Sequence, residues 1–361
     1  MASVYYFMHI DWRWIKQRPQ FLAEELQRGG HAVRVFDRRI WRTDIVTNNP
    51  TSLDVRGLRA SPGRLRLPSA LDRGLLRTQA RWTSRGEIPD LVWVTHPSIT
   101  EYLPPRLSGA TLVYDAMDDH AALAPPSERP RIQQLERALL ARADLVLASS
   151  ETILNNIRES TWSSSTPLLV RNGLPYESSA TYSPAMNSRE VMRLGYVGTI
   201  SKWLDLDSLL YLLGECEDVE VHLFGPADVQ LPAHPRLVHH GPVSRADLAA
   251  RVSACHAFIM PFVDSPIVRA VDPVKVYEYL SWNRPTFVSE WAETEHFGEL
   301  IKRYRTAEEL LSLVQHFRHH EASLVPDRTL VEEFLRYNTW RSRGDQIRSA
   351  LHSLLQGRKA A

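Results

Sequence analysis

SPIVRAVDPVKVYEYLSWNRPTFVSE, residues 265–290, is the stretch on which the predicted fold depends. Asp272 and Pro273 predict the start of a helix, because a carboxylate can cap the first turn and proline is pre-set for it. The helix ends near Asn283, which can take a left-handed turn, and Thr286–Val288 predicts a short buried strand after it. A helix followed at once by a buried strand is typical of a parallel sheet wrapped by helices.

Two charged residues share one face of this helix. Lys275 and Glu278 are three positions apart, and they lie near a helix N-terminus, which attracts anions. A cation, a helix N-terminus and a carboxylate together could hold a diphosphate and a ribose hydroxyl. The alternative is a solvated ion pair on an ordinary helix, and both interpretations stay open at this point.

Length and composition favour a two-domain globular chain. The 361 residues are 43% apolar and 24% charged, and a net charge of +1 gives no general attraction to nucleic acid. The N-terminal stretch MASVYYFMHI lacks a basic lead, so we expect a first strand and not a signal peptide. No apolar run approaches the roughly 18 residues of a membrane span. We therefore expect a cytosolic chain, or one peripheral on the cytosolic face of a membrane.

Strand and helix patterns alternate twice along the chain. We predict an α/β fold of two doubly wound Rossmann-like domains facing a cleft, since such sheets bind ligands at the carboxyl ends of their strands. The predicted parts are a first domain (1–175), a linker (176–189), a second domain (190–338) and a C-terminal helix crossing back to the first domain (339–361).

The segment Arg56–Arg85 is unusually basic. It contains eight arginines and no glutamate, interleaved with leucine, proline and Trp82. One interpretation is a patch that meets an anionic membrane surface or an acidic acceptor. The other is an ordinary arginine-rich surface.

Five stretches, taken in order, resemble a known family: WRWIKQRPQFLAEEL, LVYDAMDDH, LGYVGTISKWLD, GPVSRADLAARVSACHAFIMPF and DPVKVYEYLSWNRPTFVS. They are similar to GT-B nucleotide-sugar glycosyltransferases of the retaining family-4 type, among them bacterial enzymes of cell-surface polysaccharide synthesis such as the teichuronic-acid kind. The resemblance implies transfer of a hexose-type sugar from a nucleoside diphosphate to a saccharide acceptor, lipid-linked or part of a polysaccharide. It also implies retention of configuration, no metal and no cofactor.

The resemblance assigns donor-binding roles to the opening stretch. Glu278 matches the second glutamate of the family's E-x7-E element and would bind the ribose. The first glutamate of that element falls at Ala270, which is a departure from the family. Asp272 would supply a carboxylate from a nearby position, although its predicted capping role competes with this. Lys275 completes the predicted donor set on this helix.

A glycine loop follows the first strand of the second half. Gly198, Thr199 and Lys202 lie between a predicted strand and a predicted helix, where backbone N–H groups and a cation can hold a phosphate. The alternative is a plain strand-to-helix connection with an exposed lysine. Without nearby carboxylates to hold a metal, Lys202 would act in catalysis by offsetting the charge of the leaving diphosphate.

The sequence YDAMDDH ends a strand of the first half. By resemblance, Asp118, Asp119 and His120 would contact the donor sugar or act near the acceptor hydroxyl. Their spacing fits no strict set of metal ligands. The alternative is that Asp115 and Asp118 cap the segment that follows.

The loop DWRWIKQR follows the first strand and supplies the predicted acceptor site. Trp12 and Trp14 offer flat faces for sugar rings, and Arg13, Lys16 and Arg18 could meet phosphate or carboxylate. The alternative is that the two tryptophans fasten the loop to its domain.

Two other functions suit the same architecture. A sugar-nucleotide epimerase would act on the donor alone, and a non-catalytic nucleotide-sugar binder would explain Ala270. A dinucleotide oxidoreductase is disfavoured, because G-x-G-x-x-G after a first strand is absent from both halves.

Overall fold

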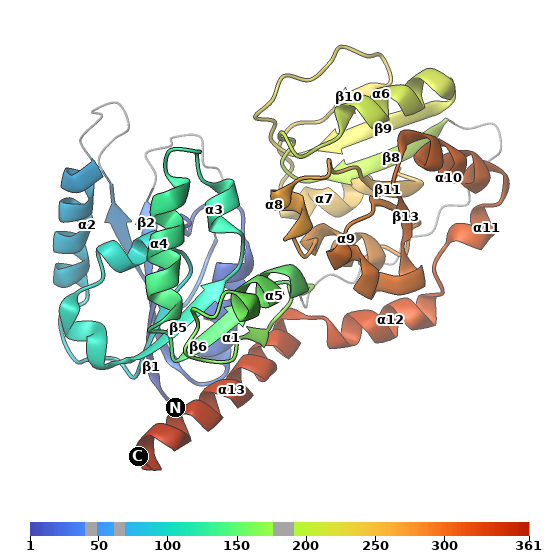
Figure 1. Ribbon diagram of the computed structural model, residues 1–361. Helices are drawn as coiled ribbons and strands as arrows, with labels where there is room; N and C mark the ends of the chain where they lie inside the picture. Colours follow the sequence, from blue (N-terminus) through green and yellow to red (C-terminus); the bar gives the residue numbers. More distant parts are fainter. Residues whose placement is uncertain (40–48, 61–68, 176–190, 361) are drawn as a thin grey trace. The chain divides into compact units, whose positions relative to one another are not determined.

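The computed structural model describes residues 1–39, 49–60, 69–175 and 191–360. The chain divides into two compact units: unit 1 is Met1–Asn172 with Trp340–Ala361, and unit 2 is Gly173–Thr339. Each unit is a parallel sheet with helices packed against it (Figure 1). The two predicted α/β halves are thereby confirmed. The predicted linker, 176–189, lies outside the described residues.

The described part of unit 1 forms a seven-stranded sheet in the order β3-β2-β1-β4-β5-β6-β7, with every pair parallel. Phe7 on β1 pairs with Phe36 on one side and Val94 on the other. The central strands are buried along most of their length, as parallel strands covered on both faces must be. The strands are β1 (Ser3–Met8), β2 (Ala32–Arg39), β3 (Asp54–Arg59), β4 (Leu91–Val94), β5 (Thr111–Ala116), β6 (Leu145–Ala148) and β7 (Leu168–Leu169).

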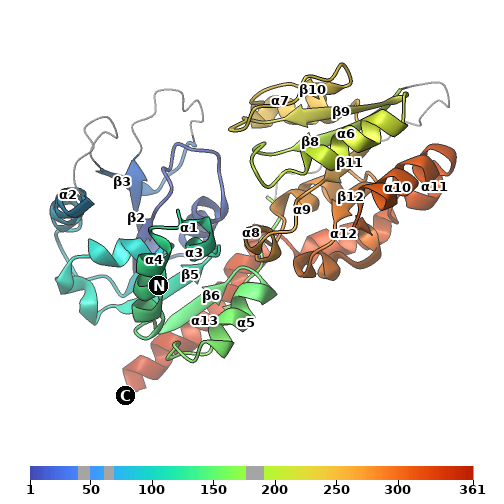
Figure 2. The same ribbon diagram turned by 45° about the horizontal axis from the view of Figure 1, so that its top comes forward.

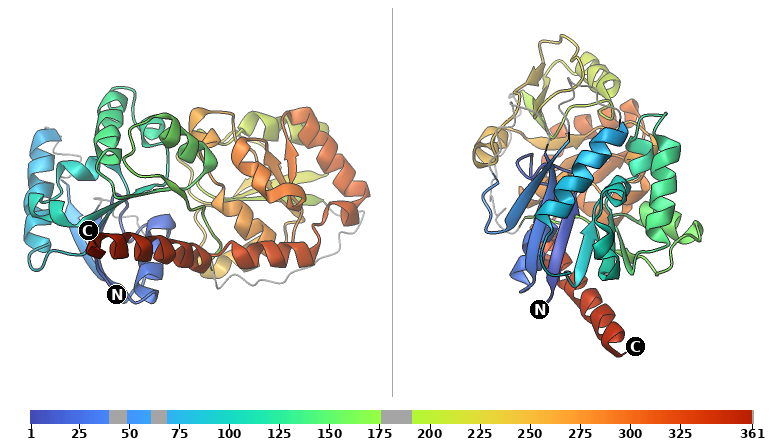
Figure 3. Two further views of the ribbon diagram at one scale, coloured as in Figure 1. Left: turned by 60° about the horizontal axis from the view of Figure 1, so that its bottom comes forward. Right: turned by 90° about the vertical axis from the view of Figure 1, so that its left-hand side faces the viewer.

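The helices of unit 1 include the last helix of the chain, α13. Its Trp340 ring stacks on Phe21 of α1 with centroids 5.0 Å apart, so α13 lies beside α1 (Figure 3). The helices are α1 (Arg18–Arg28), α2 (Ser69–Thr83), α3 (His120–Leu123), α4 (Arg129–Leu140), α5 (Glu151–Glu159) and α13 (Trp340–Ala360), with 3₁₀ helices η2 (Pro97–Glu101) and η3 (Pro105–Gly109).

The described part of unit 2 forms a six-stranded parallel sheet in the order β10-β9-β8-β11-β12-β13. The strands are β8 (Met192–Val197), β9 (Val219–Phe224), β10 (Leu237–His239), β11 (Ala257–Met260), β12 (Thr286–Ser289) and β13 (Lys302–Tyr304). The helices are α6 (Leu206–Glu215), α7 (Arg245–Val252), α8 (Pro266–Arg269), α9 (Val274–Ser281), η4 (Ala292–Leu300), α10 (Ala307–His319), α11 (Glu321–Leu324) and α12 (Arg328–Tyr337). Two apolar clusters form its core.

Helix α9 corrects one prediction and confirms two. Pro273 occupies the N-cap position, so Asp272 lies one residue before it and is not the cap. Asn283 has φ +49°, the left-handed conformation predicted for it. The strand β12 follows, as expected.

The basic segment contains two elements that were not predicted. Within the basic segment, β3 adds an edge strand and α2 packs beside it (Figure 2). Among the described residues, no helix combines the length and the hydropathy that crossing a membrane requires.

Candidate active site

The carboxyl edge of the unit 1 sheet is built around a buried ion pair. Arg18, at the start of α1, donates from Nε and Nη2 to Asp115 Oδ1 at 3.0 and 2.8 Å. Its Nη1 donates to Val170 O at 2.6 Å. The two side chains are 3% and 0% exposed. Arg18 thus joins α1, the end of β5 and the residue after β7, and this burial argues against the acceptor contact predicted for it.

The other residues of the predicted acceptor loop divide into two kinds. Trp12 is buried and bonded at both ends: its backbone N donates to Asp37 and its indole N–H donates to Asn49 O. It fastens the loop, as the alternative interpretation held. Arg13, Trp14 and Lys16 remain at least partly exposed, although Arg13 pairs with Asp11 and Lys16 with Glu24, each at 2.7 Å.

The two aspartates before α3 have different environments. Asp119 is the N-cap of α3 and accepts a hydrogen bond from Ala122 N at 2.8 Å, so the capping role falls to Asp119 and not to Asp115 or Asp118. Burial raises the pKa of Asp118 to about 7, while Arg18 opposes the shift. A carboxyl group with this pKa can give or take a proton near neutrality.

Three histidines meet at this edge, and sequence reasoning identified only one of them. His9 follows β1, His96 follows β4 and His120 begins α3 after β5; their ring centroids are 4.3 to 5.4 Å apart. His9 Nδ1 lies 3.0 Å from Thr95 Oγ1, and His96 Nδ1 accepts from Ser98 N at 3.0 Å. Strands β1, β4 and β5 are neighbours in the sheet, which is why three distant histidines converge.

The histidines are neutral at physiological pH. Burial lowers the pKa of His96 to about 4, with a further contribution from the charge of Arg38. Burial also lowers the pKa values of His9 and His120 well below the ordinary range. His120 is 3% exposed, and its Nε2 has no hydrogen-bond partner among the described residues. Neutral imidazoles suit hydroxyl ligands better than phosphate, because each ring can both donate and accept.

At the carboxyl edge of the unit 2 sheet, residues 198–205 connect β8 to α6 as a fixed loop. Gly198 N donates to Phe224 O at 2.9 Å, and Ile200 N donates to Pro226 O at 2.8 Å. Gly225 lies so close that a Cβ atom there would be 2.0 Å from Gly198 O. Lys202 is exposed and forms no ion pair with any described residue. The loop therefore has a rigid backbone and an available cation.

Helix α9 is tied to this loop. The hydroxyl of Tyr279 accepts a hydrogen bond from Val197 N at 2.8 Å and lies 3.3 Å from Val197 O, directly before Gly198. Glycine loop and helix are therefore adjacent parts of one edge, as parallel strands predict.

The charged pair on α9 is largely shielded from water on one side. Lys275 Nζ lies 2.9 Å from Glu278 Oε2, with side chains 28% and 11% exposed. Such burial of Glu278 is unlike the fully solvated pair of the alternative interpretation. Lys275 holds the carboxylate in one orientation.

The remaining predicted carboxylate is turned inward. Asp272 is 2% exposed and accepts a hydrogen bond from the Tyr277 hydroxyl at 3.2 Å. That hydroxyl also lies 3.0 Å from His296 Nε2. Ala270, where the family has glutamate, is buried at the end of α8.

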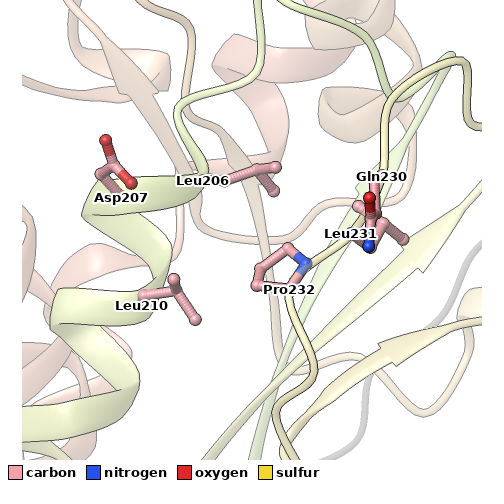
Figure 4. A pocket seen from close by; sticks show the side chains of 6 residues that line it. All are labelled: Leu206, Asp207, Leu210, Gln230, Leu231 and Pro232. Carbon is pink, nitrogen blue, oxygen red and sulfur yellow. The ribbon is translucent and has the colours of Figure 1, made fainter.

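A cavity of about 340 Å³ lies between α6 and the chain after β9 (Figure 4). None of the predicted site residues lines it; its lining is Leu206, Asp207, Leu210, Gln230, Leu231 and Pro232. Within the described residues, no group of three or more His, Cys, Asp or Glu side chains is arranged to hold a metal ion.

The two parallel sheets, with candidate binding residues at their carboxyl edges, indicate the class of protein. The chain has the GT-B fold, and residues 15–173, which lie mostly in unit 1, match the glycosyl transferase 4-like domain. A distant relative is TuaH of Bacillus subtilis (strain 168), assigned to teichuronic acid biosynthesis as a glycosyltransferase. It is 26% identical over 214 residues, which cover 54% of each chain. The chain thus spans about half the length of this curated relative.

Solved structures extend the likeness in fold to the whole chain. Sucrose-phosphate synthase from Thermosynechococcus elongatus has a TM-score of 0.74 at 14% identity, covering 99% of this chain and all of that one. HepE of Anabaena, in complex with UDP-glucose, has a TM-score of 0.71 at 12% identity, covering 98% of this chain and all of that one. The lipopolysaccharide outer core galactosyltransferase WaaB has a TM-score of 0.67 at 11% identity, covering 97% and 99%.

Proposed function

We propose that the chain is a retaining glycosyltransferase. It transfers a hexose-type sugar from a nucleoside diphosphate, bound by unit 2, to a saccharide acceptor, lipid-linked or part of a polysaccharide, bound by unit 1. The match of residues 15–173 and the relative TuaH support the reaction class. HepE, whose fold this chain shares, binds UDP-glucose, which supports a nucleotide-sugar donor.

The observation that supports this proposal most strongly is that the glycine loop and helix α9 are adjacent. Tyr279 fastens α9 to the residue before Gly198, so a phosphate-binding type of loop and the Lys275–Glu278 pair belong to one edge. We assign the diphosphate to Lys202, Lys275 and the loop from Gly198 to Thr199. We assign a ribose hydroxyl to Glu278, whose carboxylate can accept its hydrogen bond.

On unit 1 we assign the acceptor saccharide to Arg13, Trp14 and Lys16, and we assign hydroxyl contacts to His120 and Asp118. The unpartnered Nε2 of His120 supports this, because a buried nitrogen without a partner gains from a ligand hydroxyl. We leave out Trp12, Arg18 and Asp119, whose polar groups are bonded within the fold.

The chemistry follows from the charge that develops on the leaving group. The acceptor oxygen bonds to the anomeric carbon on the face from which the diphosphate leaves, the carbon–phosphate-oxygen bond breaks, and the leaving phosphate takes the acceptor's proton. Lys202 and Lys275 offset the growing negative charge without a metal. Lys202→Ala should then lower kcat/KM at least about tenfold, the equivalent of about 1.5 kcal/mol for a charged hydrogen bond.

The test is product analysis with a panel of nucleotide sugars and saccharide acceptors, using wild type, Lys202→Ala and Lys302→Ala. Lys302 begins β13 and so lies at the opposite edge of the same sheet, which makes it a matched control. A new glycoside with retained configuration, lowered by Lys202→Ala alone, supports the proposal. An epimer of the donor sugar, or wild-type rates with Lys202→Ala, would contradict it.

A further inference from the structure

Helix α2 presents two different faces. Its inner face packs on unit 1 through Leu76 and Ala80, which are 4% and 0% exposed. The Gln79 side chain holds the edge strand β3, because it donates to Arg59 O at 2.8 Å and accepts from Arg59 N at 2.9 Å. These contacts fix which residues of α2 point away from the unit.

The outer face of α2 carries three exposed large apolar side chains, with Thr78 exposed between the second and the third. Leu71, Leu75 and Trp82 are 58%, 43% and 63% exposed. Their spacings of four and seven residues put them on one side of the helix. Ile88, in the segment after the helix, is 58% exposed. Among the described residues, four of twelve exposed large apolar side chains thus fall within 18 positions, too concentrated for scattered surface residues.

Cations flank this apolar stripe. Arg81 and Arg85 are exposed, and the Arg85 guanidinium lies 3.9 Å from the centre of the Trp82 ring. Arg81 forms no ion pair with a described residue. Glu87 and Asp90 are also exposed nearby, and Asp72 lies half-buried beside Leu71, so the surface carries acidic groups as well as these two cations.

Other arginines of the Arg56–Arg85 segment do not contribute to this exposed surface. Arg56 pairs with Asp54 on β3, and Arg73 faces Glu101 at 3.7 Å. Arg77 donates to Glu101 O at 2.6 Å. Arg64 and Arg66 lie outside the described residues. The structure therefore confines the candidate surface to the outer side of α2 and the segment after it.

We propose that this α2 surface, formed by Leu71, Leu75, Arg81, Trp82, Arg85 and Ile88, binds an anionic lipid bilayer. Apolar residues on one helix face beside exposed arginines are typical of helices that lie in the membrane interface. A tryptophan carrying an arginine fits the boundary where acyl chains meet phosphates. Leu71, Leu75 and Trp82 enter the acyl region, while Arg81 and Arg85 contact headgroup phosphates. Binding here concerns unit 1 alone and is independent of sugar transfer.

The test is sedimentation of the intact chain with vesicles of phosphatidylcholine, alone or mixed with phosphatidylglycerol. The wild-type chain should sediment with the anionic vesicles only, and raised salt should release it. Leu71→Ser/Leu75→Ser/Trp82→Ser should bind at least about tenfold more weakly, because burial of two methylene groups in lipid already exceeds that factor. Arg81→Gln/Arg85→Gln should also weaken binding.

Matched controls remove similar groups elsewhere. Leu330→Ser/Tyr337→Ser removes exposed apolar side chains of α12, and Arg142→Gln/Arg158→Gln removes exposed arginines of unit 1. Both should leave vesicle binding unchanged, and the triple variant should keep nucleotide binding. The proposal is overturned if the wild-type chain binds neither vesicle, if the triple variant binds like wild type, or if the surface instead mediates dimerisation that the triple variant abolishes.

Discussion

Removal of the Arg18 guanidinium should destabilise unit 1 strongly. In Arg18→Met, the carboxylate of Asp115 would remain buried without its cation, and Val170 O would lose its 2.6 Å donor. Breaking a buried ion pair from one side costs about 3–5 kcal/mol. We therefore expect Arg18→Met to lower the free energy of unfolding of unit 1 by about that amount. Urea titration read by hydrogen exchange of β5 amides would report unit 1 separately from unit 2.

A double-mutant cycle isolates the pair itself. Arg18→Met/Asp115→Asn should be less destabilised than the sum of the single variants, with a coupling of at least about 1 kcal/mol. Arg158→Met, an exposed arginine on α5 of the same unit, serves as control. If Arg18→Met instead left stability within about 1 kcal/mol of wild type and impaired only acceptor binding, the assignment of Arg18 to the fold would be wrong.

Two further predictions concern pH and the glycine loop. His96 becomes protonated below about pH 6.5 in the unfolded chain but only near pH 4 in the folded chain. Between these two pH values the unfolded state binds more protons than the folded state. The free energy of unfolding therefore falls as the pH falls. When the pH is lowered from about 7 to about 5, the free energy of unfolding of unit 1 should fall by about 2 kcal/mol more in wild type than in His96→Gln. Urea titrations at the two pH values would measure this difference. Equal losses in the two proteins would contradict the low pKa of His96. Gly225→Ala should destabilise unit 2 by about 2–4 kcal/mol, because the new methyl group would overlap Gly198 O and φ is +145°. Gly214→Ala, which meets no atom within 4 Å, should not destabilise the unit in the same chemical denaturation series.

The sequence suffices for the fold because both halves alternate regularly between apolar strands and amphipathic helices. It fails at α2 for a physical reason: Leu71, Leu75 and Trp82 face outward while Leu76 and Ala80 face inward. With apolar residues on both faces, the helical period is obscured.

The candidate site was predicted in part, and the misses have a common cause. Lys275 and Glu278 were predictable because a helix brings residues three apart together. Arg18 and Asp115 are 97 positions apart in the sequence, so no local spacing predicts their ion pair. His9 and His96 each closely follow a buried strand, a signal that is readable in the sequence. Their meeting with His120 depends on the neighbouring order of β1, β4 and β5, which the sequence alone does not give.

Asp272 shows how tertiary packing overrides a local signal. A carboxylate before proline is a good cap by propensity, but the Asp272 carboxylate is buried, where it accepts a hydrogen bond from the Tyr277 hydroxyl. The helix then begins one residue later than its sequence predicts.

The most direct test of the central claim is calorimetric titration of a panel of nucleotides and nucleotide sugars into wild type, Glu278→Ala and Glu299→Ala. Glu299 is an exposed carboxylate elsewhere in unit 2 and serves as the matched control. We predict selective binding by wild type and by Glu299→Ala, with affinity reduced at least about tenfold in Glu278→Ala, since the ribose would lose a charged hydrogen bond. Binding that is unchanged in Glu278→Ala would place the donor elsewhere, and no binding by any nucleotide would contradict the assignment of unit 2 to a nucleotide sugar.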